Sequence, residues 1–330
     1  MTFIRRFCSS ITKTEYPTNY LTFKKWVNIC PKRKRVHNYI NPILFDVTLR
    51  DGLQALTSEE ANKYTIDKKQ EIFYKMLYKY NPNRFEIGSL VNSKVYPVFK
   101  DTTQFYKYLQ TTNPHLDNLY VLIPNKTHLH KALGERMTNL SFITSISNAF
   151  QKKNTRMTVE ESRNQIFDMM HEIDNYRMIA EKKQFNIKVY ISCVNECPII
   201  GKIDEDIVVN NLHSYLRRWD ISELSLSDTC GTLTIDSFSY ILNTFLMMYS
   251  NIDKLSLHLH TSSGYDENTE KIIHCALDNG LNRFDVSHLE TGGCSVTMDK
   301  TKLKSNLTYK QFYYYYCKYI EERTKRKYFS

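Results

Sequence analysis

Two histidines one residue apart are the clearest sign of chemistry in this 330-residue sequence. His258 and His260 flank Leu259 in the run KLSLHLH, whose alternation is typical of a strand. Residues two apart in a strand point to the same side, so the two imidazoles converge on one point. This arrangement is common among metal ligands, and the alternative is a pair of histidines held only by hydrogen bonds.

A second group of polar residues ends the apolar run ILFDVTL, where Arg50 and Asp51 stand side by side. Asp51 can add a carboxylate oxygen to the two imidazoles. Such a mixed set suits a divalent ion, although these ligand types alone do not identify the metal. We expect Mg²⁺ or Mn²⁺, with Co²⁺ or Zn²⁺ as alternatives. Arg50 beside a metal is suited to binding a developing oxyanion, and the alternative is a solvated ion pair.

Cys294 follows two glycines in TGGC. Its predicted place in a flexible loop favours a reactive thiol, and the alternative is a buried structural cysteine. The sequence has eight cysteines in a long chain without a secretory signal, so we expect reduced thiols and no disulfide scaffold.

The elements that must position these residues follow a repeated strand–helix pattern. Eight short runs rich in apolar, β-branched or aromatic residues are predicted strands, at 43–49, 84–89, 119–124, 141–147, 188–193, 223–228, 254–260 and 283–288. Helical patterns follow them at about 67–80, 101–111, 126–138, 158–183, 204–218, 235–249, 266–279 and 308–323.

Eight strand–helix units predict a closed (β/α)₈ TIM barrel. The competing fold is an open doubly wound sheet, which usually has a glycine-rich first turn that is not seen in this sequence. Active sites of such barrels lie at the carboxyl ends of the strands, where Arg50, Asp51, His258, His260 and Cys294 all fall.

The net charge of +10 is concentrated at the amino terminus. Residues 1–38 carry nine Lys/Arg against one acid, which leaves only +2 for the other 292 residues. We therefore predict a basic leader, 1–38, followed by a single barrel domain, 39–330, and no nucleic-acid partner. The opening MTFIRRFCSS favours a mitochondrial transit peptide, and the alternative is an ordinary basic extension of a cytoplasmic protein. No apolar run is long enough to span a bilayer, so no membrane partner is expected.

Five motifs in order resemble the hydroxymethylglutaryl-CoA lyase family, a branch of the DRE-type TIM-barrel metallolyases. They are TLRDGLQ, YISCVNECPIIGKI, LSLSDTCG, LHLH and GGC, which with the flanking chain span about residues 43–316. The resemblance implies a lyase that cleaves 3-hydroxy-3-methylglutaryl-CoA to acetyl-CoA and acetoacetate, as in leucine degradation and ketone body formation. It also implies an acyl-CoA substrate and a homodimer.

By this resemblance, Asp51, His258 and His260 would bind the divalent metal, with Asn306 as a fourth ligand, and His258 would also belong to the catalytic set. Arg50 would stabilise the enolate, and Cys294 would protonate the acetyl-CoA carbanion. Glu86 and Asp228 would be acidic residues that support the site.

The sequence departs from the family at four places, the first of which is Ala55-Leu56 after Gln54, where the family usually has Asn-Glu. Thr261-Ser262-Ser263-Gly264 stands where the family has Asp-Thr-Tyr-Gly, which removes a carboxylate expected to tune the metal. The segment between Cys294 and Asn306 is longer than usual, and about 24 residues follow Asn306, fewer than in relatives. Two alternatives therefore stay open: a related aldolase or condensing enzyme, and a catalytically silent barrel that serves as a binding subunit.

Overall fold

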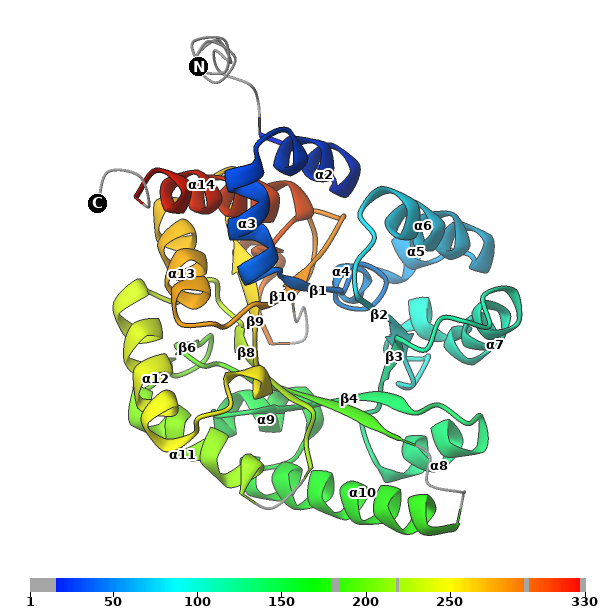
Figure 1. Cartoon of the computed structure of the whole chain (residues 1–330). Coiled ribbons are helices and arrows are strands. Elements are labelled where there is room, and N and C mark those ends of the chain that lie inside the picture. Colours follow the sequence, from blue (N-terminus) through cyan, green and yellow to red (C-terminus); the bar gives the residue numbers. More distant parts are fainter. Residues whose placement is uncertain (1–15, 180–183, 218–219, 294–296, 327–330) are drawn as a thin grey trace, which may run out of the picture.

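Eight parallel strands close into a barrel (Figure 1). The computed structural model describes residues 16–179, 184–217, 220–293 and 297–326. Strand β10 pairs with both β1 and β9, which closes the sheet and confirms the predicted (β/α)₈ fold. The barrel strands, in order around the ring, are β1 Ile43–Asp46, β2 Arg84–Ser89, β3 Leu119–Leu122, β4 Asn139–Ser145, β5 Asn186–Ser192, β8 Glu223–Asp228, β9 Leu255–Thr261 and β10 Arg283–Val286.

A helix follows each barrel strand and packs on its outer face (Figure 1). Several begin at a side-chain cap, as where Thr65, Thr234 and Asp266 accept hydrogen bonds from amides of the first helical turn. These helices are α6 Ile66–Lys79, α7 Thr102–Thr112, α8 Lys126–Gly134, α10 Val159–Ile179, α11 Glu205–Leu216, α12 Ile235–Met248, α13 Glu267–Asp278 and α14 Tyr309–Arg326.

The main hydrophobic core lies between the strands and the helices, and the lumen holds charged side chains beside a small separate apolar cluster of Phe45, Val47 and Tyr120. In β5, Val189 and Ile191 belong to that core, while Lys188 and Tyr190 alternate with them. Lys188 binds Asp285 of β10, a strand that is not a neighbour of β5 in the sheet. Side chains of such strands can meet only across the lumen, so the period-two alternation of β5 separates an apolar outer face from a charged inner one.

Smaller elements connect these units, most of them near the carboxyl ends of the strands and one 3₁₀ turn just before β9. Short helices follow β1 and β4, a hairpin follows β5, and a short strand pairs antiparallel with the end of β9. They are α4 Asp51–Gln54, α5 Ser58–Ala61, α9 Asn148–Thr155, β6 Glu196–Cys197, β7 Gly201–Lys202 and β11 Ser305–Asn306, with 3₁₀ turns η1 Pro97–Phe99, η2 Ile252–Lys254 and η3 Lys300–Lys302. The sequence pattern did not predict them.

Two further helices, α2 Tyr20–Ile29 and α3 Pro31–Ile40, lie beside α14 (Figure 1). Phe23 contacts the rings of Tyr313 and Tyr316 at centroid distances of 5.2 and 5.5 Å. Arg33 pairs with Glu321 at 3.0 Å. Much of the segment predicted as a leader is therefore helical and packed, and its role in targeting stays a prediction.

Two more findings concern the chain as a whole. None of the helices in the described ranges combines the length and the hydropathy that a membrane crossing needs. The six cysteines within the described residues are free thiols, namely Cys30, Cys193, Cys197, Cys230, Cys275 and Cys317.

Candidate metal centre

Asp51, His258 and His260 come together at the carboxyl end of the barrel, as the sequence predicted. Their ligand atoms all lie within 4.8 Å of one another, and all three side chains are buried. Asp51 Oδ2 lies 3.9 Å from His258 Nε2 and 3.7 Å from His260 Nε2, and the two Nε2 atoms are 3.1 Å apart. Strand β9 presents both imidazoles on one face, and Asp51 begins α4, which is separated from the end of β1 by four residues.

The outer nitrogens of both imidazoles already have acceptors. His258 Nδ1 lies 3.1 Å from Asp285 Oδ2, and His260 Nδ1 lies 2.9 Å from the carbonyl oxygen of Lys304. Each Nδ1 therefore donates its hydrogen outward. In neutral rings this leaves two Nε2 lone pairs facing each other beside a carboxylate, which is unfavourable unless a cation lies between them.

Burial keeps His260 neutral. Removal from water, with His258 nearby, lowers the pKa of His260 to about 4. Burial would raise the pKa of Asp51, but Arg50 and the two histidines lower it overall, so this carboxylate stays charged. Two imidazole nitrogens and a carboxylate oxygen form a set that fits a divalent ion.

Asn306 and two glycines close over Asp51. Asn306 pairs with His260 in the β11–β9 ladder, and its Nδ2 donates to Asp51 Oδ2 at 3.0 Å. Its Oδ1 is buried with no hydrogen-bond partner among the described residues. The amide would have to turn for this oxygen to become a ligand, so the assignment of Asn306 as fourth ligand stays a prediction.

Glycine is required at positions 292 and 293 because the backbone there lies very close to Asn306 and Asp51. Gly292 has φ +138°, and a Cβ there would lie 2.1 Å from Asn306 Nδ2. Gly293 donates its amide hydrogen to Asp51 Oδ2 at 3.1 Å. Only a residue without a side chain lets the loop after β10 reach the site this closely.

Arg50 is held by three partners beside the cluster. Its Nε donates to Glu86, and its Nη1 donates to Asp51 Oδ1 at 2.5 Å and to Gln54 Oε1 at 3.3 Å. Burial alone would lower the pKa of Arg50, but Glu86 and Asp51 raise it well above its ordinary value. The guanidinium is therefore a fixed cation at the carboxyl end of the lumen.

Glu86 lies beneath Arg50 and also accepts the hydroxyl hydrogen of Tyr190 at 2.9 Å. The Tyr190 ring faces the guanidinium, with its centroid 4.8 Å from Cζ of Arg50. Among the described residues, Glu86 contacts Arg50 and Tyr190 and is not part of the metal cluster. Its role is therefore to orient the arginine.

The space between these groups is small. A cavity of about 40 Å³ is lined by Arg50, Asp51, Tyr190, His258, His260 and Gly293, among others. It has room for an ion or a few water-sized groups and not for a large organic molecule. Cys294, the predicted proton donor, lies outside the described residues, next to Gly293.

A family model for HMGL-like proteins matches residues 41–296 of the sequence. The chain belongs to the HMGL-like family. The matched segment contains all eight barrel strands and the three clustered residues Asp51, His258 and His260.

Named relatives in this family are lyases. A human cytoplasmic 3-hydroxy-3-methylglutaryl-CoA lyase is 28% identical over 255 residues, which cover 76% of this chain and 63% of that protein, less than two thirds of its length. A mitochondrial hydroxymethylglutaryl-CoA lyase of Macaca fascicularis is 26% identical over 255 residues, with coverage of 76% and 71%. A solved HMG-CoA lyase from Acinetobacter baumannii, in complex with coenzyme A and 3-methylmalate, is 25% identical with a TM-score of 0.66, covering 81% of this chain and 80% of that one.

Asp228, predicted as a supporting acid, shapes a loop of this HMGL-like barrel. Its two oxygens accept the amide hydrogens of Thr232 and Leu233, each at 3.0 Å. Burial raises the pKa of Asp228 to about 6 despite these bonds. The residue lines a neighbouring cavity of about 270 Å³ together with His260 and Lys304, so it borders the metal cluster without belonging to it.

Sequence reasoning missed two residues of the site. Asp285 supplies a carboxylate behind His258, and Tyr190 donates a hydrogen bond to Glu86. In β5 and β10, these two residues and other polar residues alternate with apolar ones along the strand. That alternation was the available signal for lumen-facing residues.

Proposed function

We propose that this HMGL-like protein is a divalent-metal-dependent carbon–carbon lyase that cleaves 3-hydroxy-3-methylglutaryl-CoA to acetyl-CoA and acetoacetate. The observation that carries the proposal is the pair of facing Nε2 atoms, His258 and His260, 3.1 Å apart with Asp51 beside them. The named relatives and the A. baumannii complex with coenzyme A support the same substrate class.

The residues present fit a bound divalent ion, held by Asp51, His258 and His260 with Asn306 as a proposed fourth ligand. Such an ion supplies Lewis-acid polarisation and orients oxygen groups of the substrate. Asp285 and the Lys304 carbonyl fix both imidazoles in the tautomer that offers Nε2 inward. The histidines therefore need no rearrangement of their rings to act as ligands.

The other residues act on charge and protons. A general base takes the tertiary hydroxyl proton, and the carbon–carbon bond then breaks to give acetoacetate and the enolate of acetyl-CoA. Arg50, fixed by Glu86 and lining the cavity, stabilises the negative charge of the enolate oxygen. Cys294 then gives its thiol proton to the enolate carbon, and the glycines before it let its loop approach the site.

The decisive experiment measures acetoacetate released by purified protein after chelation and reloading with Mg²⁺, Mn²⁺, Co²⁺ or Zn²⁺. We expect metal-dependent release and no release from the chelated protein. Metal-loaded protein that binds acyl-CoA normally but shows no turnover above background would instead identify a silent barrel acting as a binding subunit.

A second candidate is an aldolase or condensing enzyme of the same superfamily. Thr261 and Ser262, which differ from the family pattern, line the cavity beside His260, where substrate-specific contacts would be made. A panel of acyl-CoAs and 2-oxo acids separates the two candidates, because each predicts turnover of a different compound.

We also propose mitochondrial import, with the cytoplasm as the alternative; relatives of both kinds are known. Sequencing the mature amino terminus in the native host tests this: a start before residue 10 contradicts import processing.

The proposed homodimer is tested by light scattering of the purified protein.

A further inference from the structure

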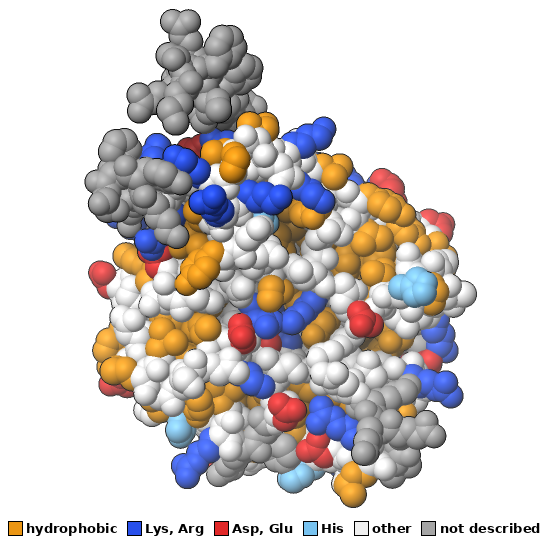
Figure 2. Space-filling model, viewed as in Figure 1, with side chains coloured by type: hydrophobic (Ala, Val, Ile, Leu, Met, Phe, Trp, Pro, Cys, Tyr) orange, Lys and Arg blue, Asp and Glu red, His pale blue; other side chains and the backbone are white. Residues whose placement is uncertain are grey.

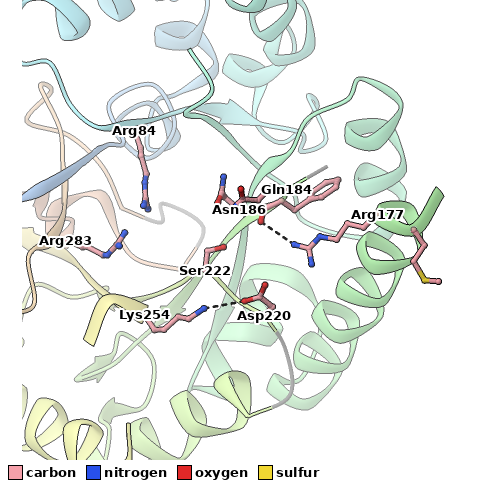
Figure 3. A pocket seen from close by; sticks show the side chains of 10 residues that line it. Arg84, Arg177, Gln184, Asn186, Asp220, Ser222, Lys254 and Arg283 are labelled. Atoms are coloured by element: carbon pink, nitrogen blue, oxygen red, sulfur yellow. Dashed lines mark hydrogen bonds and ion pairs between the residues drawn. The ribbon is translucent and has the colours of Figure 1, made fainter. Parts of the chain in front are cut away.

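Another cavity lies at the opposite end of the barrel from the metal centre. It measures about 860 Å³, and its lining residues include the first residues of three barrel strands: Arg84 of β2, Asn186 of β5 and Arg283 of β10. Figure 2 shows Lys and Arg side chains gathered at the centre of one face of the molecule, and Figure 3 shows the cavity with Arg84 and Arg283 directed into it. This volume lies in the range of small-molecule sites.

The charges at the base of this cavity do not balance. Arg84 and Arg283 share one oxygen, Glu223 Oε2, at 2.8 and 3.3 Å. The other oxygen of Glu223 accepts from Lys188 at 2.8 Å, and Lys188 also donates to Asp285 at 2.5 Å. Three cations therefore share two carboxylates, and the surplus positive charge falls on the two arginines, whose side chains are 24% and 16% exposed.

The two arginines also keep hydrogen-bond donors available. Nε of Arg283 is buried with no partner among the described residues. Within the same residues, Arg84 makes a hydrogen bond only through Nη1, which leaves its other N–H groups facing the cavity. A guanidinium has five donors in a planar fork that matches the oxygens of a phosphate or carboxylate.

The positively charged side chains at the rim of the cavity already have acidic partners. Lys254 lies 3.4 Å from Asp220, and Arg177 lies 2.9 Å from Asp174. The Arg177 guanidinium also lies 5.5 Å from the ring centroid of Phe185, which is buried. The free positive charge is therefore confined to Arg84 and Arg283, and the space beside them is much larger than an inorganic anion and partly apolar.

We propose that this cavity binds the phosphate group of a small organic molecule, held between Arg84 and Arg283, with the rest of the molecule in the adjoining space of the cavity. Charge-assisted bonds from two guanidinium groups to one tetrahedral anion give both affinity and orientation. The site is separate from the metal centre and does not depend on the proposed lyase activity.

Isothermal titration of the full chain with glycerol 3-phosphate and with inorganic phosphate tests the proposal. Chelated protein is used, so that phosphate cannot bind through a metal. We expect glycerol 3-phosphate to bind more tightly than inorganic phosphate, and the double variant Arg84→Gln/Arg283→Gln to bind it at least about tenfold more weakly. Equal affinity for the two probes would overturn the organic part of the proposal and assign the site to free phosphate.

Two controls keep this test specific. The variant Lys24→Gln/Lys25→Gln removes two exposed cations of α2 and should leave binding unchanged. If the double arginine variant does not fold, by circular dichroism, Arg84→Lys and Arg283→Lys keep the charge beside Glu223 but lose the fork, and each should weaken binding several-fold. Absence of binding to the native chain, or binding that the arginine variants leave intact, would show that these residues only close the end of the barrel.

Discussion

His258 Nδ1 and Asp285 Oδ2 lie 3.1 Å apart on neighbouring strands, and this contact decides which nitrogen of His258 faces the site. Asp285 at the same time binds Lys188, which binds Glu223, which binds Arg84 and Arg283. A continuous line of charged side chains thus runs through the lumen from the proposed phosphate pocket to the metal centre.

Asp285→Asn should weaken metal binding by about 10- to 100-fold, because an amide holds the His258 ring less firmly and leaves Nε2 less basic. Lys188 keeps Glu223 as a partner, so the variant should still fold. Titration of chelated protein with Mn²⁺ measures the effect, and Asp253→Asn, an exposed acid of η2, is the matched control. Equal affinity in both variants would remove Asp285 from the metal site.

Arg50→Lys should lower kcat of the proposed lyase reaction by about 10²- to 10³-fold. A lysine ammonium cannot contact Glu86, Asp51 and the enolate through one rigid plane, as the guanidinium can. Metal content should remain, since the three clustered ligands are unchanged. Steady-state kinetics beside the exposed control Arg156→Lys measures this, and a kcat equal to that of the control would contradict the role of Arg50.

Cys294→Ser should lower turnover by about 100-fold or more, because a serine hydroxyl is a much weaker acid than a thiol in general acid catalysis. Metal content should change little. Cys275→Ser, on the remote helix α13, controls for the loss of a thiol. Unchanged turnover in Cys294→Ser would take this residue out of the mechanism.

The barrel was predictable because its strands are covered on the outside by helices. This burial produces eight short apolar runs, and the observed strands begin within two residues of the predicted ones. The convergence of Asp51, His258 and His260 was predictable for a related reason, since the carboxyl ends of all barrel strands meet at one rim.

Contacts across the lumen were not predictable in the same way. Alternation shows that Lys188, Tyr190 and Asp285 face inward. It does not show their partners, because Lys188 meets Asp285 and Tyr190 meets Glu86 across the lumen, from strands that are adjacent neither in sequence nor in the sheet. Helices α2 and α3 were missed for another reason. Their buried residues, Phe23, Trp26, Val27 and Val36, are few among many Lys and Arg, so the apolar stripe is weak.

Glu223→Gln should destabilise the protein by about 3 to 5 kcal/mol at pH 7, because it leaves Lys188, Arg84 and Arg283 with a neutral partner in a buried place.

This loss of stability should depend on pH. Burial would raise the pKa of Glu223, but Lys188 and the two arginines lower it from 4.5 to about 2. A carboxylate with a depressed pKa contributes its stability above pH 4.5 and loses it as the pH falls toward 2. The gap in unfolding free energy between wild type and Glu223→Gln should therefore be constant from pH 7 to 5 and narrow below pH 4.5. Urea titrations at pH 7, 5 and 3.5 measure it. A gap that stays constant down to pH 3.5 would mean that folding does not lower the pKa of Glu223, and the strength of its pairing with Lys188 and the two arginines would have to be revised.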